Sequence, residues 1–196
     1  MSNLKNIKYN VLSKEWATLH RIDFDYQFKD GRWKTISREC YNRGNGAGVL
    51  LYNANKQTVI LTRQFRMPAY VNDAREGMSI EVCAGALDQN EDPETCIIRE
   101  IEEEVGFKVD KVKKVLECYM SPGAVTEKMY LFVAEYTDEM KVHSGGGLES
   151  EDEEIEVLEI PFTEALQMME ENKIIDAKTQ LLIQYAQINR LLKCKS

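Results

Sequence analysis

The stretch GALDQNEDPETCIIREIEEEVGF, residues 85–107, decides the fold of this chain. Asp92 in N-cap position followed by Pro93 predicts the start of a helix, and Gly106 predicts its end. At about 100° per residue, the apolar side chains between these points form one stripe that should pack on a sheet. These side chains are Ile97, Ile98, Ile101 and Val105. The stretch therefore predicts an amphipathic helix that covers one face of a sheet.

The same helix gathers Glu100, Glu103 and Glu104 in a second sector about 100° wide, at a repulsive cost of about 0.2–0.5 kcal/mol per pair. Most acidic runs are solvated helix faces, and Glu102 is interpreted in that way. The glutamate sector, however, borders the apolar stripe instead of opposing it. Arg99 precedes Glu103 by one turn and should hold it in place. Carboxylates clustered without His or Cys suit Mg²⁺ or Mn²⁺, which also bind substrate phosphates.

Composition limits the classes of protein that remain. The 196 residues suffice for one well-cored domain with a small appendage, and the net charge of -8 argues against a broad nucleic-acid surface. No stretch has the length of a signal peptide core or a membrane span. Five scattered cysteines without a CxxC motif indicate a reducing compartment, and two histidines make a zinc site improbable. We therefore expect a cytoplasmic protein without nucleic-acid or membrane partners.

The rest of the chain predicts strands with helices on the faces of a mixed sheet. Residues 20–42 alternate apolar and polar side chains around Asp30-Gly31, which is a hairpin signal. Asp176 is placed as a helix N-cap. We expect further strands at residues 46–53, 58–65, 79–85, 112–120, 127–137 and 155–160, and C-terminal helices at residues 161–172 and 176–193. Residues 143–154 are expected to form an acidic loop.

The opening stretch resembles the Nudix box, G-x5-E-x7-R-E-U-x-E-E-x-G-U with U a bulky apolar residue, at every fixed position. The matching positions are Gly85, Glu91, Arg99, Glu100, Ile101, Glu103, Glu104, Gly106 and Phe107. The resemblance implies a hydrolase that cleaves a nucleoside diphosphate linked to another group. It also implies an α/β/α sandwich with a mixed sheet at residues 43–196, preceded by a small antiparallel β domain for dimerisation at residues 1–42.

Sequence outside the box narrows the resemblance. Pro122 lies 15 residues beyond the last box position, and RQFR (63–66) and EVCAG (81–85) are similar to the ADP-ribose pyrophosphatase branch. Over nearly the whole chain the sequence resembles the bacterial GDP-mannose pyrophosphatases. That resemblance implies Mg²⁺-dependent cleavage of GDP-mannose to GMP and mannose 1-phosphate by a homodimer with swapped N-terminal domains. ADP-ribose is the alternative substrate, and a non-catalytic module that binds a nucleotide sugar is a third hypothesis.

The resemblance also implies roles for individual residues. Glu100, Glu104 and the backbone carbonyl of Ala84 match metal ligands, and Glu103 supports them. Substrate contacts are implied for Trp16, Ser37, Arg38, Glu39, Arg66, Ala84, Gly85, Glu127 and Lys178. Without the box, Arg66 would be interpreted as part of a wetted strand end and Trp16 as part of a small core. With it, Arg66 is the better candidate for phosphate binding, whereas Trp16 stays open between the two interpretations.

A glutamate of the acidic loop is implied as catalytic base, metal ligand or both, and the loop appears one residue longer than the family pattern. Counting back from Ile155 selects Glu153, whereas counting forward from the glycines selects Glu151. We favour Glu153 because a strand fixes register more firmly than a glycine-rich loop. Glu153 would share a face with Ile155 only if extended structure begins before the isoleucine. The run Gly145–Gly147 is expected to give the loop freedom to close.

Overall fold

The computed structural model describes residues 3–73, 76–148, 150 and 152–193. The chain divides into two compact units, and each is described by itself below. The first consists of Met1–Asn45 with Tyr119–Lys128, and the second of Gly46–Cys118 with Met129–Ser196. Within the described ranges, no helix combines the length and the apolar character that a membrane crossing needs.

The N-terminal unit is a three-stranded antiparallel sheet in the order β1-β2-β3. Its strands are β1 (Leu4–Lys14), β2 (Thr18–Gln27) and β3 (Trp33–Asn42). The hairpin expected at residues 20–42 is confirmed as β2 and β3, and the strand β1, which the sequence patterns did not reveal, pairs with β2. Tyr41 N–H donates to the Ala124 carbonyl (2.8 Å), which joins the later segment to this sheet.

The second unit is built on a seven-stranded mixed sheet in the order β10-β5-β4-β9-β8, with β6 added on β5 and β7 on β4. Its strands are β4 (Gly46–Asn53), β5 (Thr58–Phe65), β6 (Met78–Glu81), β7 (Cys83–Ala86), β8 (Lys113–Tyr119), β9 (Lys128–Glu135) and β10 (Glu156–Pro161). The central pair β4 and β9 is parallel, and β5 runs antiparallel to β4 and β10. The mixed sheet expected from the sequence is thereby confirmed.

The single strand predicted at residues 79–85 was wrong, because the segment forms two strands that divide at Val82. Before Val82, β6 pairs with β5, and after Val82, β7 pairs with β4. The Val82 N–H donates instead to the Thr179 side-chain hydroxyl (2.8 Å) in the C-terminal helix region. The Thr179 hydroxyl thus accepts the hydrogen bond of a backbone N–H that has no strand partner at the point where the chain passes from β6 to β7.

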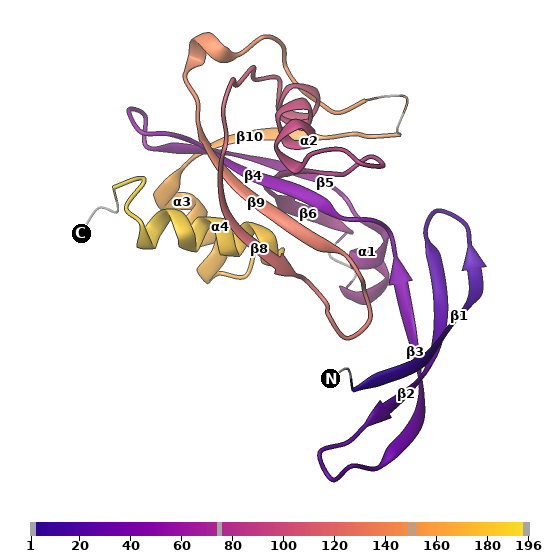
Figure 1. Cartoon of the computed structure of the whole chain (residues 1–196). Helices are drawn as coiled ribbons and strands as arrows, with labels where there is room; N and C mark the ends of the chain where they lie inside the picture. Colours follow the sequence, from indigo (N-terminus) through magenta and orange to yellow (C-terminus); the bar gives the residue numbers. More distant parts are fainter. Residues whose placement is uncertain (1–2, 74–75, 149, 151, 194–196) are drawn as a thin grey trace. The chain divides into compact units, whose positions relative to one another are not determined.

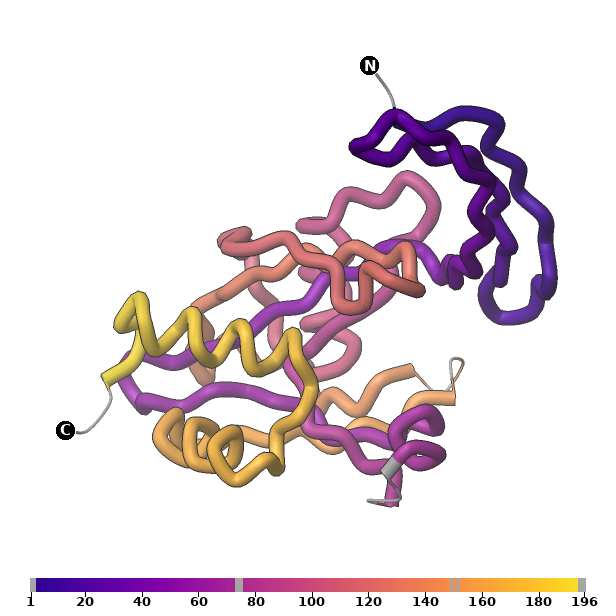
Figure 2. Tube along the Cα trace, turned by 90° about the horizontal axis from the view of Figure 1, so that it is seen from below, coloured from indigo at the N-terminus to yellow at the C-terminus, as the bar shows by residue number. Residues whose placement is uncertain are grey.

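Helices cover both faces of this sheet (Figures 1 and 2). The helical elements are α1 (Met67–Asp73), α2 (Pro93–Glu100), the π-helix η1 (Ile101–Val105), the 3-10 helix η2 (Asp138–Met140), α3 (Phe162–Glu170) and α4 (Ala177–Ile188). The α2 helix lies on one face, and α3 and α4 lie on the other. The N-cap predicted at Asp176 is confirmed, since its carboxylate accepts from Thr179 N–H. The sequence patterns did not predict α1, and α4 ends five residues earlier than expected.

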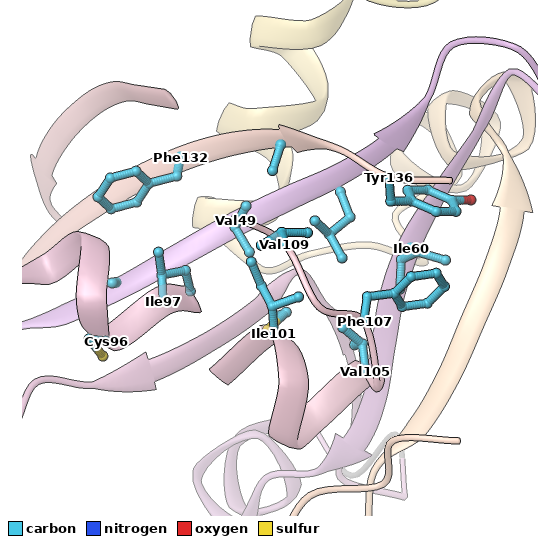
Figure 3. Packing of buried hydrophobic residues seen from close by; sticks show 14 residues of the cluster. Val49, Ile60, Cys96, Ile97, Ile101, Val105, Phe107, Val109, Phe132 and Tyr136 are labelled. Atoms are coloured by element: carbon cyan, nitrogen blue, oxygen red, sulfur yellow. The ribbon is translucent and has the colours of Figure 1, made fainter. Parts of the chain in front are cut away.

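The apolar stripe of the opening helix packs on the sheet as predicted (Figure 3). Ile97 and Ile101 are fully buried and belong to a core cluster with Val49 of β4 and Phe132 of β9. Complete burial of a side chain of this size contributes about 1.5–3 kcal/mol relative to exposure. This packing fixes the helix on the sheet, and with it the glutamates that the helix carries.

Candidate active site

The helix that carries the glutamates is not uniform. We expected a regular helix from Asp92 to Gly106, but it is α-helical only to Glu100 and continues as a π-helix to Val105. The Gly106 N–H donates to the Glu102 carbonyl (3.1 Å) and also to the Ile101 carbonyl five residues earlier, and Gly106 ends the helix with a positive φ of 75°. Single π turns inside helices occur frequently at functional sites. The wider turn changes where the last glutamates point.

Glu104 is directed into the protein and is only 2% exposed. Its carboxylate accepts from the Ala84 N–H (3.1 Å) and from the Cys83 thiol. Burial raises the pKa of Glu104 to about 8, and the charges of Glu100 and Glu153 act in the same direction. A carboxylate in this position favours either a proton or a nearby cation.

Glu100 lies against Gly85, where a Cβ atom would overlap its carboxylate. Any larger residue at position 85 would therefore force the Glu100 carboxylate to move from this position. Arg99 lies 2.9 Å from the Glu100 carboxylate. Burial nevertheless raises the pKa of Glu100 to about 7, helped by the charges of Glu103 and Glu153. Two neighbouring carboxylates with raised pKa values, the partly buried Glu100 and the buried Glu104, thus project from consecutive helix turns.

Arg99 holds Glu103 as the sequence predicted, with 2.8 Å between Nη1 and Oε2. It also reaches Glu91, the first acidic position of the box, at 3.4 Å. The resulting arrangement keeps Glu103 at the rim of the site, half-buried and paired. Next to it lies a depression of about 440 Å³, which is lined by Arg99, Glu102, Glu103, His143, Gly145, Gly147 and Leu148.

The glycine run after His143 packs on the end of the π-helix. Gly146 N–H donates to the Glu104 carbonyl (2.9 Å), and Gly147 N–H donates to the Glu103 carbonyl (3.3 Å). A Cβ atom at Gly145 would overlap the Glu104 carbonyl. All three glycines have positive φ. These glycines therefore let the loop backbone approach the end of the π-helix closely enough to donate hydrogen bonds to the Glu103 and Glu104 carbonyls. This role is separate from the freedom to close that the sequence predicts for the loop.

Glu153 enters the same region from the other end of this loop. Leu148 N–H donates to its Oε2 (3.1 Å), and the Glu153 charge raises the pKa of both Glu100 and Glu104. The β10 strand begins at Glu156, after Ile155, so strand register does not place Glu153. The hydrogen bond across the loop places it instead. Glu151, the alternative candidate, lies outside the described residues.

A buried ion cluster lies where β5, β6 and α4 meet. Arg66 Nε and Nη2 donate to the two Glu81 carboxylate oxygens (3.0 and 3.1 Å), and Lys178 Nζ lies 2.6 Å from the same carboxylate. Lys178 also pairs with Asp176 (3.0 Å). The sequence interpretation named Arg66 and Lys178 but not Glu81, although Glu81 opens the EVCAG motif. Burial alone would raise the pKa of Glu81, but the Lys178 and Arg66 charges lower it to about 2.

The oxygen donors near Glu104 fit a hard divalent cation. The possible ligands are carboxylate and backbone oxygens, without imidazole. A cation would lower the raised pKa values of Glu100 and Glu104, because it favours the charged form of a carboxylate. Across the described part of the chain, no three acidic, His or Cys side chains stand close enough to hold a metal ion as a set. Glu100 turns to Arg99, Glu104 to Ala84 N–H and Glu153 to Leu148 N–H.

The remaining candidates belong to the N-terminal unit. Arg43 lies over the Trp16 ring (5.2 Å) and pairs with Glu127 (3.1 Å), so two of the candidates are brought together through a third residue. Trp16 is 77% exposed and does not form part of a core. In β3, Ser37 donates to Asp23 on β2 (2.5 Å).

The neighbouring candidates Arg38 and Glu39 lie opposite Ile22 and Arg21 of β2, respectively. Directly paired residues share a face, and successive residues of a strand alternate between faces. The Arg38 and Glu39 side chains therefore project to opposite faces of the sheet, and Glu39 shares its face with Ser37. One face alone cannot present both Arg38 and Glu39 to a ligand.

Comparison with known proteins agrees with this geometry. Residues 42–180 match the NUDIX domain model, and residues 3–41 match the model of the GDP-mannose pyrophosphatase NudK N-terminal domain. The chain is 50% identical over 186 residues to proteins named GDP-mannose pyrophosphatase from Shigella dysenteriae serotype 1 (strain Sd197) and from Escherichia coli O157:H7, covering 95% of this chain and 96% of each relative. The chain therefore belongs to the Nudix family and is a Nudix hydrolase.

Proposed function

We propose that this enzyme hydrolyses the diphosphate of GDP-mannose, giving GMP and mannose 1-phosphate, and that it requires Mg²⁺ or Mn²⁺. The observation that carries this proposal is the position of buried Glu104 within electrostatic range of Glu100 and Glu153, in an intact Nudix box of a chain 50% identical to proteins of that name. The raised pKa values of Glu100 and Glu104 mark the acidic centre that a cation-dependent cleavage of a diphosphate needs.

Glu100, Glu104, Glu153 and the Ala84 carbonyl would hold the metal. When bound, the cation neutralises phosphate oxygens and stabilises the departing phosphate. The ordered parts of the site suit this task, since Arg99 keeps Glu103 at the rim and the Leu148 N–H holds Glu153 within electrostatic range of Glu100 and Glu104. To hold one cation together, these carboxylates would have to turn from the partners that they have here.

A carboxylate of this chain would take the proton from the attacking water. Glu153 is the proposed base because it comes from the loop, is partly exposed and interacts electrostatically with Glu100 and Glu104. Glu103 is the weaker candidate, because its carboxylate is already paired with Arg99 (2.8 Å). Glu151 remains the alternative.

Arg66 is proposed to bind a substrate phosphate, since its guanidinium is 43% exposed while Glu81 holds one edge. Gly85 and Ala84 would present backbone groups to the substrate beside Glu100. Lys178 is proposed to support the same phosphates. For the nucleotide we propose contacts from the N-terminal unit: Trp16, Ser37, Arg38, Glu39 and Glu127.

We further propose that residues 1–42 act as a dimerisation domain that is swapped between two copies of the chain. The supporting observation is an apolar sheet face in which Tyr9 and Val11 remain 67% and 59% exposed, beside Ile22 and His20 of the neighbouring strand. Apolar sheet faces of this kind are usually covered by another layer. Sedimentation equilibrium should show a dimer, and a fully active monomer would contradict the swap.

The substrate assignment is tested by steady-state kinetics on pure protein with Mg²⁺. The panel consists of GDP-mannose, ADP-mannose and ADP-ribose, so that base and sugar vary separately. We expect the highest kcat/KM for GDP-mannose. A preference for ADP-ribose would move the enzyme to the alternative substrate. Tight binding of one nucleotide sugar without any hydrolysis would instead indicate a non-catalytic module.

A further inference from the structure

Glu81 links the two cations that lie beside the proposed phosphate-binding position. Its carboxylate accepts two hydrogen bonds from Arg66, one on each oxygen, and lies 2.6 Å from the Lys178 ammonium. A planar guanidinium that is held through Nε and Nη2 has a fixed orientation, because the two parallel bonds leave no rotation about the pair. The edge that carries Nη1 is then the one directed away from Glu81.

Burial separates the roles of the three side chains. Glu81 and Lys178 are 6% and 12% exposed, whereas Arg66 is 43% exposed. Glu81 therefore does not present its own oxygens to a ligand. Any effect of Glu81 on ligand binding would pass through Arg66. The charge of Glu104 also acts on Arg66 and stabilises its charged form. Arg66 is thus the exposed member of the ion cluster and lies within electrostatic range of the proposed metal site.

The cluster is anchored in the fold on its far side. Lys178 also pairs with Asp176, and the Asp176 carboxylate accepts from both the N–H and the hydroxyl of Thr179. The Thr179 hydroxyl in turn accepts from Val82 N–H, next to Glu81 in the chain. The start of α4 is in this way connected to the point between β6 and β7. A rigid support of this kind is what a phosphate-binding arginine needs in order to be pre-organised.

We propose that Glu81 is a positioning residue of the active site, which fixes the Arg66 guanidinium for binding a diphosphate and is itself held by Lys178. The proposal rests on the proposed function, because it takes a diphosphate as the ligand of Arg66. The competing explanation is a structural one, in which Glu81 only neutralises the charges of Arg66 and Lys178. That explanation predicts a loss of stability that is unrelated to ligand binding.

The experiment is a double-mutant cycle with Glu81→Gln and Arg66→Met, singly and together. Glutamine keeps the shape of Glu81, but it has one acceptor oxygen only, and its amide nitrogen is a donor, so it cannot accept both Arg66 hydrogen bonds. We expect Glu81→Gln to raise KM for GDP-mannose about tenfold with kcat changed less than about threefold, since Arg66 binds substrate and transition state alike. In the Arg66→Met background the same change should leave KM within about twofold, because its effect passes through Arg66.

Two further measurements keep the outcomes distinct. Glu156→Gln is the matched control, because Glu156 pairs with Arg63 at an exposed site (3.2 Å) and should leave KM unchanged. The second measurement is the affinity of the same variants for inorganic pyrophosphate, determined by calorimetry in the presence of Mg²⁺. It repeats the double-mutant cycle without any turnover. Weaker pyrophosphate binding in Glu81→Gln, with no further effect in Arg66→Met, supports the positioning role even if GDP-mannose is not a substrate.

Other results overturn the proposal. Equal effects of Glu81→Gln with and without Arg66 would show that Glu81 does not act through the arginine. A lowered melting temperature with unchanged KM and unchanged pyrophosphate affinity would leave only the structural role. If the protein without any substitution does not bind pyrophosphate, Arg66 does not bind a diphosphate, and the positioning role is refuted. Loss of hydrolysis in all proteins, with an intact pyrophosphate cycle, would instead refute only the proposed function.

Discussion

Replacing Glu104 by glutamine should inactivate the enzyme and yet stabilise its metal-free form. Glu104 is 2% exposed, and the charges of Glu100 and Glu153 oppose its ionisation. Glutamine has nearly the same shape, and its carbonyl oxygen can still accept from Ala84 N–H. The substitution therefore removes a buried charge without leaving a cavity, but it also removes a proposed metal ligand.

The raised pKa of Glu104 determines how the stability of the metal-free protein changes with pH. Between the ordinary glutamate pKa of 4.5 and the folded-state pKa of about 8, the folded chain binds more protons than the unfolded chain. Stability consequently falls as the pH rises through this window, and the penalty is complete only above about pH 8. At ~1.4 kcal/mol per pKa unit, the difference between 4.5 and about 8 corresponds to a penalty of about 5 kcal/mol. Recovery of half of this penalty would raise Tm by about 5–10 °C in a chain of this size.

The assay is calorimetric melting of both proteins in EDTA at about pH 5 and about pH 9, followed by the same melts with Mg²⁺. Without metal, Glu104→Gln should melt higher than the unchanged protein at the alkaline pH and about equally at the acidic pH. Mg²⁺ should raise Tm of the unchanged protein only. The control is Glu102→Gln, an exposed position of the same helix. A variant that melts lower at both pH values, or retains near-normal kcat with saturating Mg²⁺, would refute the reasoning.

Four other substitutions test three separate features of the site and its support. Glu153→Gln should lower kcat about 10²-fold or more, the scale of a lost general base, and Glu151→Gln should cost little in the same assay; the reverse ranking would move the role to Glu151. Gly106→Ala should destabilise the protein by about 1–3 kcal/mol in urea unfolding, because its φ of 75° is strained for alanine and the new methyl group would overlap the His143 carbonyl; an unchanged midpoint would contradict this. Ile101→Ala should cost about 2–5 kcal/mol of unfolding free energy because a fully buried side chain is removed, and a loss below about 1 kcal/mol would show that the helix does not depend on this packing.

Periodicity and capping predicted the elements whose signals are local. The 3.6-residue stripe of Ile97 and Ile101, the N-cap at Asp92 and the stop at Gly106 depend on neighbouring residues, and the structure has each of them. The ion pair of Arg99 with Glu103 is likewise local to one helix turn. Such features follow from the sequence because the interacting groups are separated by a few residues only.

Features that depend on distant partners were not predicted. The division at Val82 follows from the Thr179 hydroxyl, which lies 97 positions away in the chain. Glu81 remained unnoticed because its partners Arg66 and Lys178 meet it only in the folded sheet. The π turn, which carries Glu104 inward, has no simple periodic signal, since the wider turn is stabilised by tertiary packing and by the glycine loop at its end.

The central claim is that the crowded carboxylates serve a metal-dependent cleavage of the GDP-mannose diphosphate. Phosphorus NMR of a reaction with GDP-mannose, first in EDTA and then after addition of Mg²⁺, tests this claim most directly. The account predicts that the two diphosphate signals persist in EDTA and are replaced after Mg²⁺ addition by the monoester signals of GMP and mannose 1-phosphate in equal amounts. Persistence of the diphosphate signals with Mg²⁺, or equal turnover in EDTA, would contradict it.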